Sequence, residues 1–152
     1  MLVLDSSALF AMEQLPDEES VCPPGVIKEL ARYKDRRLDL WGDLLKVCDC
    51  TAASVQKVTE VARKSGDLGR LSPVDITVIA LALDVNGKIL SDDYSIQNIA
   101  RIMDIPYSAI GQRGITKIEK WNYHCTGCGK WFKEKNDVCP ICGSPMRGCR
   151  RK

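Results

Sequence analysis

The sequence is poor in histidine, and it has no long apolar run and no nucleotide-binding glycine motif. Its single histidine, His124, leaves residues 1–116 without an imidazole for acid–base chemistry. Neither a Walker A motif nor a Rossmann glycine fingerprint is present, which argues against nucleotide-driven and dinucleotide-dependent chemistry. No apolar run approaches the roughly 20 residues that a membrane span requires, so we expect a soluble protein without a membrane partner.

A secretory signal is also missing from the first residues. The opening MLVLDSSALF has no positively charged start, and Asp5 interrupts its apolar run. We therefore expect a cytoplasmic protein whose eight cysteines stay reduced. Four of them have no evident partner, namely Cys22, Cys48, Cys50 and Cys149, and we expect the first three to be buried structural thiols.

Length and charge both divide the chain unequally. The 152 residues, of which 45% are apolar, can bury one ordinary hydrophobic core and one small second core that needs a crosslink or a bound metal to be stable. Residues 1–116 carry 13 Lys and Arg against 17 Asp and Glu, whereas residues 117–152 carry 9 against 3. An acidic unit is therefore followed by a basic one, although the net charge of the chain is only +2.

Short apolar runs alternate with helical patterns along the acidic unit. The runs that we interpret as strands are residues 1–4, 47–52, 88–91 and 105–110. The most apolar helix is expected to begin at Pro73, with Ser72 as its N-cap. This alternation predicts an α/β fold with three layers, in which helices cover both faces of a mainly parallel sheet. Since GQRGITKIEKW changes character, we expect a first domain over residues 1–112, a linker over 113–120 and a small second domain over 121–152.

Four cysteines near the C-terminus have the spacing of a zinc ribbon. Cys125, Cys128, Cys139 and Cys142 form a C-x2-C-x10-C-x2-C pattern, in which each pair can make a tight knuckle with backbone N–H groups turned toward the thiolates. Two redox motifs are disfavoured because neither pair lies in a βα unit, and an iron site of the same geometry is the other alternative. Four thiolates leave no open coordination position, so the predicted zinc is structural. His124 is then a bystander.

The basic unit mixes cations with aromatic side chains, which suits phosphate contacts and base stacking. Alternatively, the aromatic side chains cover a small core and the lysines keep it soluble, or the ribbon binds a protein. The residues that we predict to bind RNA are Lys130, Trp131, Lys133, Lys135, Arg147, Arg150 and Arg151.

Acidic residues follow the predicted strands and open the predicted helices. Each has an ordinary explanation by itself, as a helix cap or a solvated residue. Together they fit a site, because the carboxyl ends of parallel strands meet at one edge of the sheet. The candidates are Asp5, Glu29, Asp75 and Asp93, with Asp92 as a possible substitute. Such a cluster predicts Mg²⁺ or Mn²⁺ binding and phosphodiester hydrolysis by a metal-activated water.

The chain also resembles a known nuclease family. LVLDSSALF, Glu29, SGDLGRLSPVDITVIALAL and ILSDDYSIQNIA resemble the PIN domain, a small α/β nuclease fold with an acidic metal site. With YHCTGCGKWF and CPICGSPM added, the chain is similar to the archaeal Nin-one-binding family of endonucleases, which trim the 3′ end of small-subunit ribosomal RNA. The resemblance covers nearly the whole chain. It implies that Asp5, Glu29, Asp75 and Asp93 form the acidic site and that Mg²⁺ or Mn²⁺ is required.

The resemblance also implies partners and a function. The expected partners are precursor small-subunit rRNA, the pre-ribosomal particle and a KH-domain assembly factor, and the expected activity is site-specific endoribonuclease cleavage. Three alternatives stay open, namely a noncatalytic RNA-binding assembly factor, a PIN-type toxin that cleaves transfer or messenger RNA, and a zinc-ribbon protein adaptor. Because such toxins are generally bare PIN domains, the appended ribbon counts against the toxin.

Overall fold

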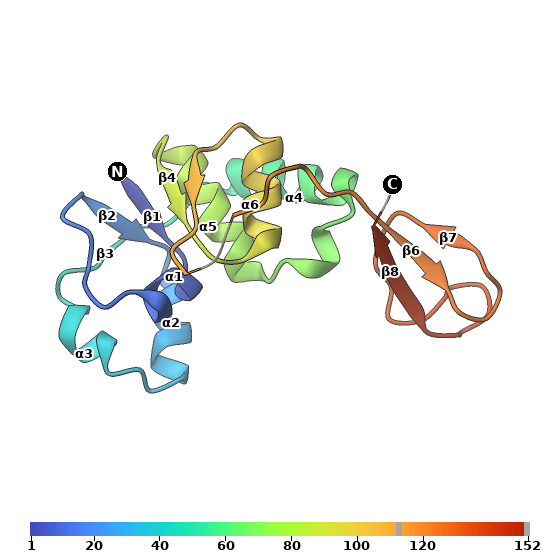
Figure 1. Cartoon of the computed structure of the whole chain (residues 1–152), viewed down its shortest axis with the longest axis horizontal. Helices are drawn as coiled ribbons and strands as arrows, with labels where there is room; N and C mark the ends of the chain where they lie inside the picture. The colour runs from blue at the N-terminus through green and yellow to red at the C-terminus, as the bar shows by residue number, and fades with distance from the viewer. Residues whose placement is uncertain (112–113, 151–152) are drawn as a thin grey trace.

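The computed structural model describes residues 1–111 and 114–150, which form two units with one β-sheet each (Figure 1). Helices surround the five-stranded sheet of the larger unit, and the three-stranded sheet lies at the far end of the molecule, beside the C-terminus. Within the described residues, no helix combines the length and the apolar character that crossing a membrane requires.

The larger unit alternates strands and helices, as predicted. Its elements are β1 (Leu2–Leu4), α1 (Ser6–Ala11), β2 (Ser20–Cys22), α2 (Pro24–Arg32), α3 (Arg37–Trp41), β3 (Lys46–Val47), α4 (Ala52–Ser65), the 3-10 turn η1 (Leu68–Arg70), α5 (Pro73–Asp84), β4 (Lys88–Leu90), α6 (Tyr94–Ile102) and β5 (Tyr107–Ser108). Helices α1, α2 and α3 pack in sequence on one another, and α4, α5 and α6 form a second packed group. The predicted three-layer α/β architecture is confirmed.

All five strands of the large sheet are parallel, in the order β3-β2-β1-β4-β5. The chain begins in the middle at β1, adds β2 and β3 on one side, and then returns to add β4 and β5 on the other. The strand order therefore reverses between β1 and β4. In open α/β sheets the carboxyl ends of the strands at this reversal form the ligand-binding crevice.

Two strands of this sheet differ from the sequence analysis. The strand expected over residues 47–52 is wrong beyond Val47, since β3 ends there and α4 begins at Ala52, and β2 was missed altogether. The only apolar residues of β2 are Val21 and Cys22, which follow a polar loop and directly precede the two prolines at the start of α2. Two apolar residues are too few to show a strand periodicity. Pairing with β1 and β3 on both sides makes this segment a strand, and that pairing exists only in the folded chain. The buried side chain of Cys22 agrees with the expectation, whereas Cys48 and Cys50 are half-buried.

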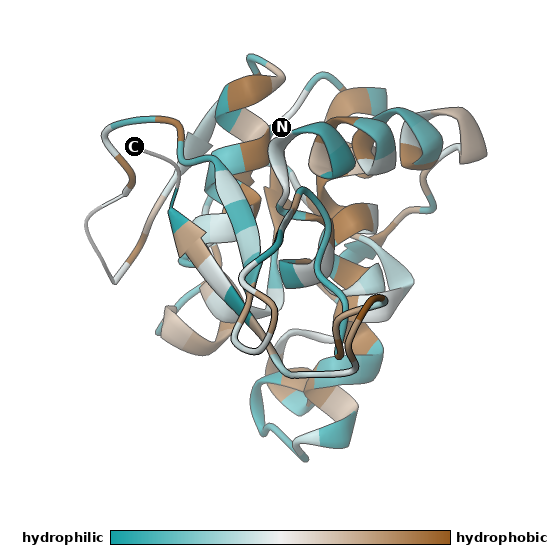
Figure 2. Ribbon diagram, turned by 90° about the vertical axis from the view of Figure 1, so that its right-hand side faces the viewer, coloured by the Kyte–Doolittle hydropathy of each residue, from teal (hydrophilic) through white to brown (hydrophobic). Residues whose placement is uncertain are grey.

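Helix α5 lies in the centre of the larger unit because its sequence is apolar nearly all round. Residues 78–82 are fully or almost fully buried. Ser72 accepts a hydrogen bond from the Asp75 N–H, and the Asp75 carboxylate accepts one from the Ser72 N–H, so the predicted N-cap is a reciprocal capping box. The amphipathic helices around it show hydrophobic and hydrophilic segments in Figure 2.

The smaller unit, here called the ribbon, spans residues 121–150. Its strands β6 (Trp121–Cys125), β7 (Trp131–Phe132) and β8 (Met146–Arg150) are antiparallel, in the order β7-β6-β8. The ribbon lies in front of the larger unit in Figure 2. It touches the glycine-rich loop between α4 and α5, where the Tyr123 hydroxyl donates to the Gly66 carbonyl at 2.9 Å.

The segment before the ribbon is bound to α6 by two buried amides. The Gln97 side chain accepts from the Ile115 N–H at 2.9 Å. The Asn98 side chain accepts from the Glu119 N–H and donates to its carbonyl, both at 2.7 Å. Residues 115–119 therefore form a fixed connection. Residues 112 and 113, where we predict the first domain to end and the linker to begin, lie outside the described residues, and the boundaries stay a prediction.

Gly66 should be one of the positions most sensitive to substitution. It ends α4 with a φ of 87°, and a β-carbon there would lie 2.4 Å from the Trp121 carbonyl oxygen. Gly129 has a similar φ of 72° but no neighbour within 4 Å. We expect Gly129→Ala to cost about 1–2 kcal/mol from backbone strain alone, and Gly66→Ala to lower the melting temperature further, since the ribbon must also move. Equal losses in thermal unfolding would contradict the close approach.

Candidate active site and metal centre

Two serines hold the first predicted acid against the neighbouring strand. Asp5 directly follows β1 and is only 2% exposed. Its Oδ2 atom accepts hydrogen bonds from Ser7 Oγ at 2.6 Å and from Ser91 Oγ at 2.8 Å. Ser91 directly follows β4, and its hydroxyl oxygen accepts a hydrogen bond from the Asp93 N–H at 3.0 Å. Asp5 and Asp93 thus lie together at the carboxyl edge of the sheet, where the strand order reverses.

Asp75 and Asp93 each cap a helix with one carboxylate oxygen. Asp93 Oδ1 accepts from the Ser95 N–H at 2.6 Å, and Asp75 Oδ2 accepts from the Ser72 N–H at 2.6 Å. Among the described residues, the second oxygen of each carboxylate has no hydrogen-bond donor. Each of these carboxylates can therefore cap its helix with one oxygen and bind a metal ion with the other. The sequence analysis treated these two roles as alternatives.

The three carboxyl groups are close enough to repel one another. Burial raises the pKa of Asp5, and the negative charge of Asp93 adds to the effect. Burial, with smaller contributions from Asp5 and Asp93, raises the pKa of Asp75 to about 6. No three acids of the described chain bring their oxygens within 4.8 Å of one another, as the cysteine sulfurs do. This looser arrangement suits an ion such as Mg²⁺, which keeps several of its own waters.

The other two predicted acids differ in their surroundings. Glu29 is half-buried in α2, and its carboxylate makes no hydrogen bond or ion pair within the described residues. It lies one helical turn after Gly25, which contacts Val74 at the start of α5, so its face of α2 is turned toward the end of α5 that carries Asp75. By contrast, both oxygens of Asp92 accept backbone N–H groups of residues 110 and 111. The geometry therefore favours Asp93 over Asp92 as the last acid of the site.

The loop before α5 adds a buried acid that the sequence analysis did not single out. Asp67 is 1% exposed, and its Oδ2 accepts from Ser65 Oγ at 2.6 Å and from Asn98 Nδ2 at 2.9 Å. Burial raises its pKa, and Asp93 acts in the same direction. Within the described residues its Oδ1 has no hydrogen-bond partner. The only signal in the sequence is the segment SGDLGRLS, which has the composition of an ordinary polar loop.

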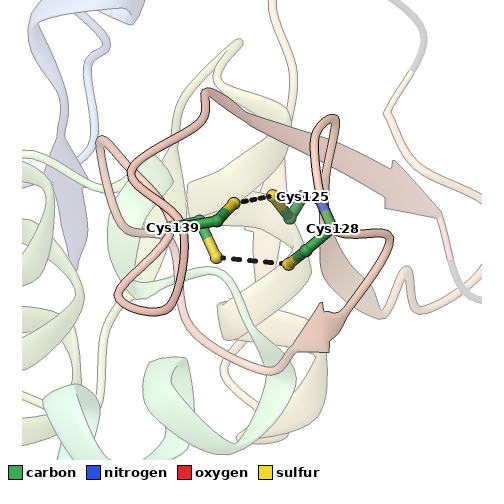
Figure 3. A group of neighbouring side chains, drawn as sticks. Cys125, Cys128 and Cys139 are labelled. Atoms are coloured by element: carbon green, nitrogen blue, oxygen red, sulfur yellow. Dashed lines mark hydrogen bonds between the residues drawn. The ribbon is translucent and has the colours of Figure 1, made fainter.

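The four predicted zinc ligands converge on one point. Their sulfur atoms all lie within 4.8 Å of one another, and Figure 3 shows Cys125, Cys128 and Cys139 pointing toward each other. The sulfurs are 3.4 Å apart between Cys125 and Cys142, and 3.7 Å apart between Cys128 and Cys139. A tetrahedral ZnS₄ site with bonds of about 2.3 Å has sulfurs about 3.8 Å apart. The cluster therefore fits a closed, four-thiolate metal site, and all eight cysteines are free of disulfides.

Each cysteine pair forms the same knuckle. The Gly127 N–H donates to Cys125 Sγ at 3.3 Å, and the Ile141 N–H donates to Cys139 Sγ at 3.4 Å. The glycine after each pair has a positive φ, 72° at Gly129 and 73° at Gly143. Each of these glycines donates its N–H to the carbonyl of the first cysteine, at 3.2 and 2.8 Å. His124 is outside the sulfur cluster and packs against the Trp131 ring, with centroids 4.9 Å apart.

The residues predicted to bind RNA divide between two faces of the ribbon. Arg150 pairs in register with Trp121, whose ring lies 3.8 Å from the Arg70 guanidinium, so this face is turned toward the larger unit. Arg147 pairs with His124 and lies on the outer face together with Trp131. Lys130, Lys133 and Lys135 lie outside strands β6 and β8, and their side chains are exposed. Arg151 lies outside the described residues.

Comparison with known proteins identifies the family. Residues 2–85 match the family described as the PIN domain of ribonuclease. These residues include Asp5, which directly follows β1, and Glu29 and Asp75, which lie on α2 and α5. The chain therefore belongs to the PIN-domain family of ribonucleases.

Relatives of nearly the same length extend this result over the ribbon. The chain is 38% identical to "Endoribonuclease Nob1" of Pyrococcus abyssi, over 96% of this chain and 91% of the relative. It is 37% identical to "Endoribonuclease Nob1" of Archaeoglobus fulgidus, over 93% and 86%. "Ribonuclease VapC1" of Thermoplasma acidophilum is 35% identical over 95% of this chain and 76% of that protein. The resemblance to Nob1 endonucleases with a C-terminal zinc ribbon is confirmed.

A solved structure supports the fold alone. The structure of VapBC-1 from nontypeable Haemophilus influenzae matches with a TM-score of 0.53 at 16% identity, over 71% of this chain and 96% of that chain. The match spans the larger part of this chain, and its identity is too low to carry an argument about substrate.

The cysteine geometry predicts one tightly held zinc ion per chain. Cys128→Ser should remove most of the bound zinc, because three thiolates leave the tetrahedron open. Cys149 lies in the same ribbon but outside the sulfur cluster, so Cys149→Ser is the matched control and should keep its zinc. Zinc per chain, measured by elemental analysis of the purified proteins, decides between them. Equal zinc contents in the two variants would contradict the assignment.

The raised pKa of Asp75 predicts a pH-dependent stability without added Mg²⁺ or Mn²⁺. Its folded pKa of about 6 exceeds the ordinary value of 3.8, so folding favours the protonated form. The stabilising contribution of Asp75 is then fully present below the ordinary pKa and is lost as the pH rises through about 6. Asp75→Asn should lack this loss, so its melting temperature should improve relative to the parent between about pH 4 and pH 7. The exposed Asp17→Asn is the control. A difference independent of pH would refute the expectation.

Proposed function

We propose that this protein is a divalent-metal-dependent endoribonuclease that processes the 3′ end of precursor small-subunit ribosomal RNA. The nuclease class follows from the PIN family; the substrate is our inference. The observation that carries the proposal is a shared surface, on which an acid of the PIN domain and a cation of the ribbon line the same open depression. That depression, of about 610 Å³, is bordered by Asp93 and by Lys135.

The acids of the site fit a divalent cation. Asp75 and Asp93 each keep one oxygen free of hydrogen-bond donors among the described residues, while the capping bonds fix the direction of the carboxylate. Ser7 and Ser91 fix Asp5 in the same way. Mutual repulsion among the three groups is relieved by a positive ion. We assign Asp5, Glu29, Asp75 and Asp93 as the residues that would hold Mg²⁺ or Mn²⁺. When bound, the ion supplies an activated water for in-line attack on the phosphodiester.

The cations around the depression suit an RNA backbone. Arg70 and Lys135 border it together with Asp93, so a phosphate drawn to these cations lies next to Asp93. Lys135 also donates to the Gly69 carbonyl at 3.3 Å, which keeps the ribbon's lysine beside the nuclease loop. Phosphate contacts of this kind position RNA without reading its sequence. Arg147, on the outer face of the ribbon, extends the same interaction.

The names of the relatives support our choice of substrate and partners. Two of the relatives described above, which match nearly the whole chain, carry the name Endoribonuclease Nob1. We infer the same role here, with the precursor small-subunit rRNA and its pre-ribosomal particle as partners in the cytoplasm, and a KH-domain assembly factor as a further partner. We also assign zinc as the ion of the four-cysteine cluster, where it stabilises the ribbon.

The test is cleavage of a transcript that spans the 3′ end of small-subunit rRNA. We expect a discrete cut with Mn²⁺ and none without added divalent metal. Asp93→Asn should lower the cleavage rate by more than about 100-fold, since changes to the mere hydrogen-bond partners of metal ligands already cost about 10- to 100-fold. Asp92→Asn should cost less, because both oxygens of Asp92 bind backbone N–H groups.

The controls separate catalysis from folding. Asp17→Asn, an exposed change remote from the site, should cleave as the parent does. The zinc content of each variant should be measured, so that damage to the ribbon is not mistaken for loss of the catalytic ion. Tight RNA binding without metal-dependent cleavage, even on precursor particles, would favour the noncatalytic assembly factor instead.

A toxin-like ribonuclease is the second candidate, because the relative named Ribonuclease VapC1 matches 95% of this chain. A match of this length includes the ribbon, so the ribbon does not exclude the toxin as strongly as the sequence analysis expected. Transfer and messenger RNA should be tested in parallel with the rRNA transcript. Preferential cleavage of either would favour the toxin-like function.

A further inference from the structure

A recessed cavity of about 290 Å³ lies between the PIN domain and the ribbon. The residues around it that carry the argument are Asp67, Arg70, Tyr94, Glu119, Trp121 and Arg150. Both units contribute, since Arg70 and Tyr94 belong to the PIN domain and Trp121 and Arg150 to the ribbon. The volume is just below the range of small-molecule pockets, about 300–1,000 Å³. It suits one nucleotide and not several.

We propose that this cavity binds one unpaired nucleotide of the RNA substrate, next to the scissile phosphodiester. The inference rests on the proposed function and names a subsite for it. The cavity adjoins the depression at Asp93, because Arg70, Tyr94 and Ser95 border both. The Ser95 N–H donates to Asp93 Oδ1 at 2.6 Å, so a residue that borders the cavity is hydrogen-bonded to the acid.

Tyr94 is the stacking surface of the subsite. It is the first residue of α6 and is 50% exposed, and among the described residues its ring is in no aromatic pair or cation–π contact. Trp121 is less available, because the Arg70 guanidinium lies 3.8 Å from its ring centre and the Arg150 guanidinium 5.7 Å. Proteins that bind single-stranded RNA stack bases on exposed aromatic rings of this kind.

The two arginines supply the phosphate contacts. Arg70 borders both the cavity and the depression, so it can reach a phosphate between them. Arg150 has an exposed side chain and a distant ion pair with Glu119, at 3.6 Å. Because the Arg150 side chain is 67% exposed, an RNA phosphate can reach its guanidinium.

Beside its two arginines, the cavity also offers hydrogen-bond acceptors. Asp67 is almost fully buried, and its Oδ1 has no partner within the described residues. The Glu119 carboxylate is the second acceptor. Carboxylates accept hydrogen bonds from the amino groups of bases, as in recognition of cytosine N4. Uracil has no amino group and offers only its N3–H to these acceptors, so it should bind least well.

The experiment measures RNA binding in the noncleaving Asp93→Asn background, with zinc retained and a short labelled single-stranded RNA as the probe. Adding Tyr94→Ala should raise Kd about 5- to 150-fold, the range expected for the loss of one base–aromatic stack. Tyr94→Phe keeps the ring and should stay within about twofold of the parent background. The matched control is Tyr33→Ala, another exposed tyrosine, 68% exposed and away from the cavity.

Competition with nucleoside 5′-monophosphates tests the choice of base. The cytidine, guanosine and adenosine compounds should displace the RNA more readily than the uridine compound. Equal competition by all four would overturn the assignment of Asp67 and Glu119 as readers of the base.

The outcomes separate this subsite from the proposed function. Wild-type affinity in Tyr94→Ala, or no RNA binding in the parent background, would overturn the subsite. In the first case, metal-dependent cleavage that still requires Asp93 would leave the proposed function intact. Conversely, binding that requires Tyr94 but is accompanied by no cleavage in the otherwise wild-type protein would support the subsite and count against the nuclease function.

Discussion

The hydrogen bonds that join the end of β1 to the end of β4 are the contact on which the candidate active site depends. Ser91 Oγ donates to Asp5 and accepts from the Asp93 N–H, so one hydroxyl positions two acids that are 88 residues apart in sequence. Parallel pairing of the two strands brings the hydroxyl there. Because the strand order reverses at the same place, no helix crossing covers this edge, and the acids can face a ligand.

The burial of these acids has opposing consequences. Buried carboxylates that repel one another favour protonation, which weakens the metal-free site as the pH rises. The same crowding of negative charge favours binding of a divalent cation, which neutralises it. The helix caps allow both burial and ligand binding. The Ser72 N–H donates to one oxygen of Asp75, and the Ser95 N–H donates to one oxygen of Asp93, so the other oxygen of each acid is left for a ligand.

The contact between the ribbon and the PIN domain decides where the basic residues lie. It depends on Gly66, whose missing side chain lets the Trp121 carbonyl approach. It also depends on the Asn98 amide, which hydrogen-bonds to both the N–H and the carbonyl of Glu119. Two units that the charge pattern separates thus form one surface. A flexible tether between them would leave the position of Lys135 relative to Asp93 undefined.

Local sequence determined the features that depend on short-range chemistry. The helix from Pro73 with its Ser72 cap, the strands at 1–4 and 88–91, and the cysteine pairs follow from patterns within a few residues, because caps, periodicity and knuckles are local. Only tertiary structure decided the rest. Strand β2 exists through its neighbours, Asp92 and Asp93 differ through contacts with residues 110 and 111, and Asp67 is buried by α6. In each case the deciding partner is far away in sequence, so no local pattern could record it.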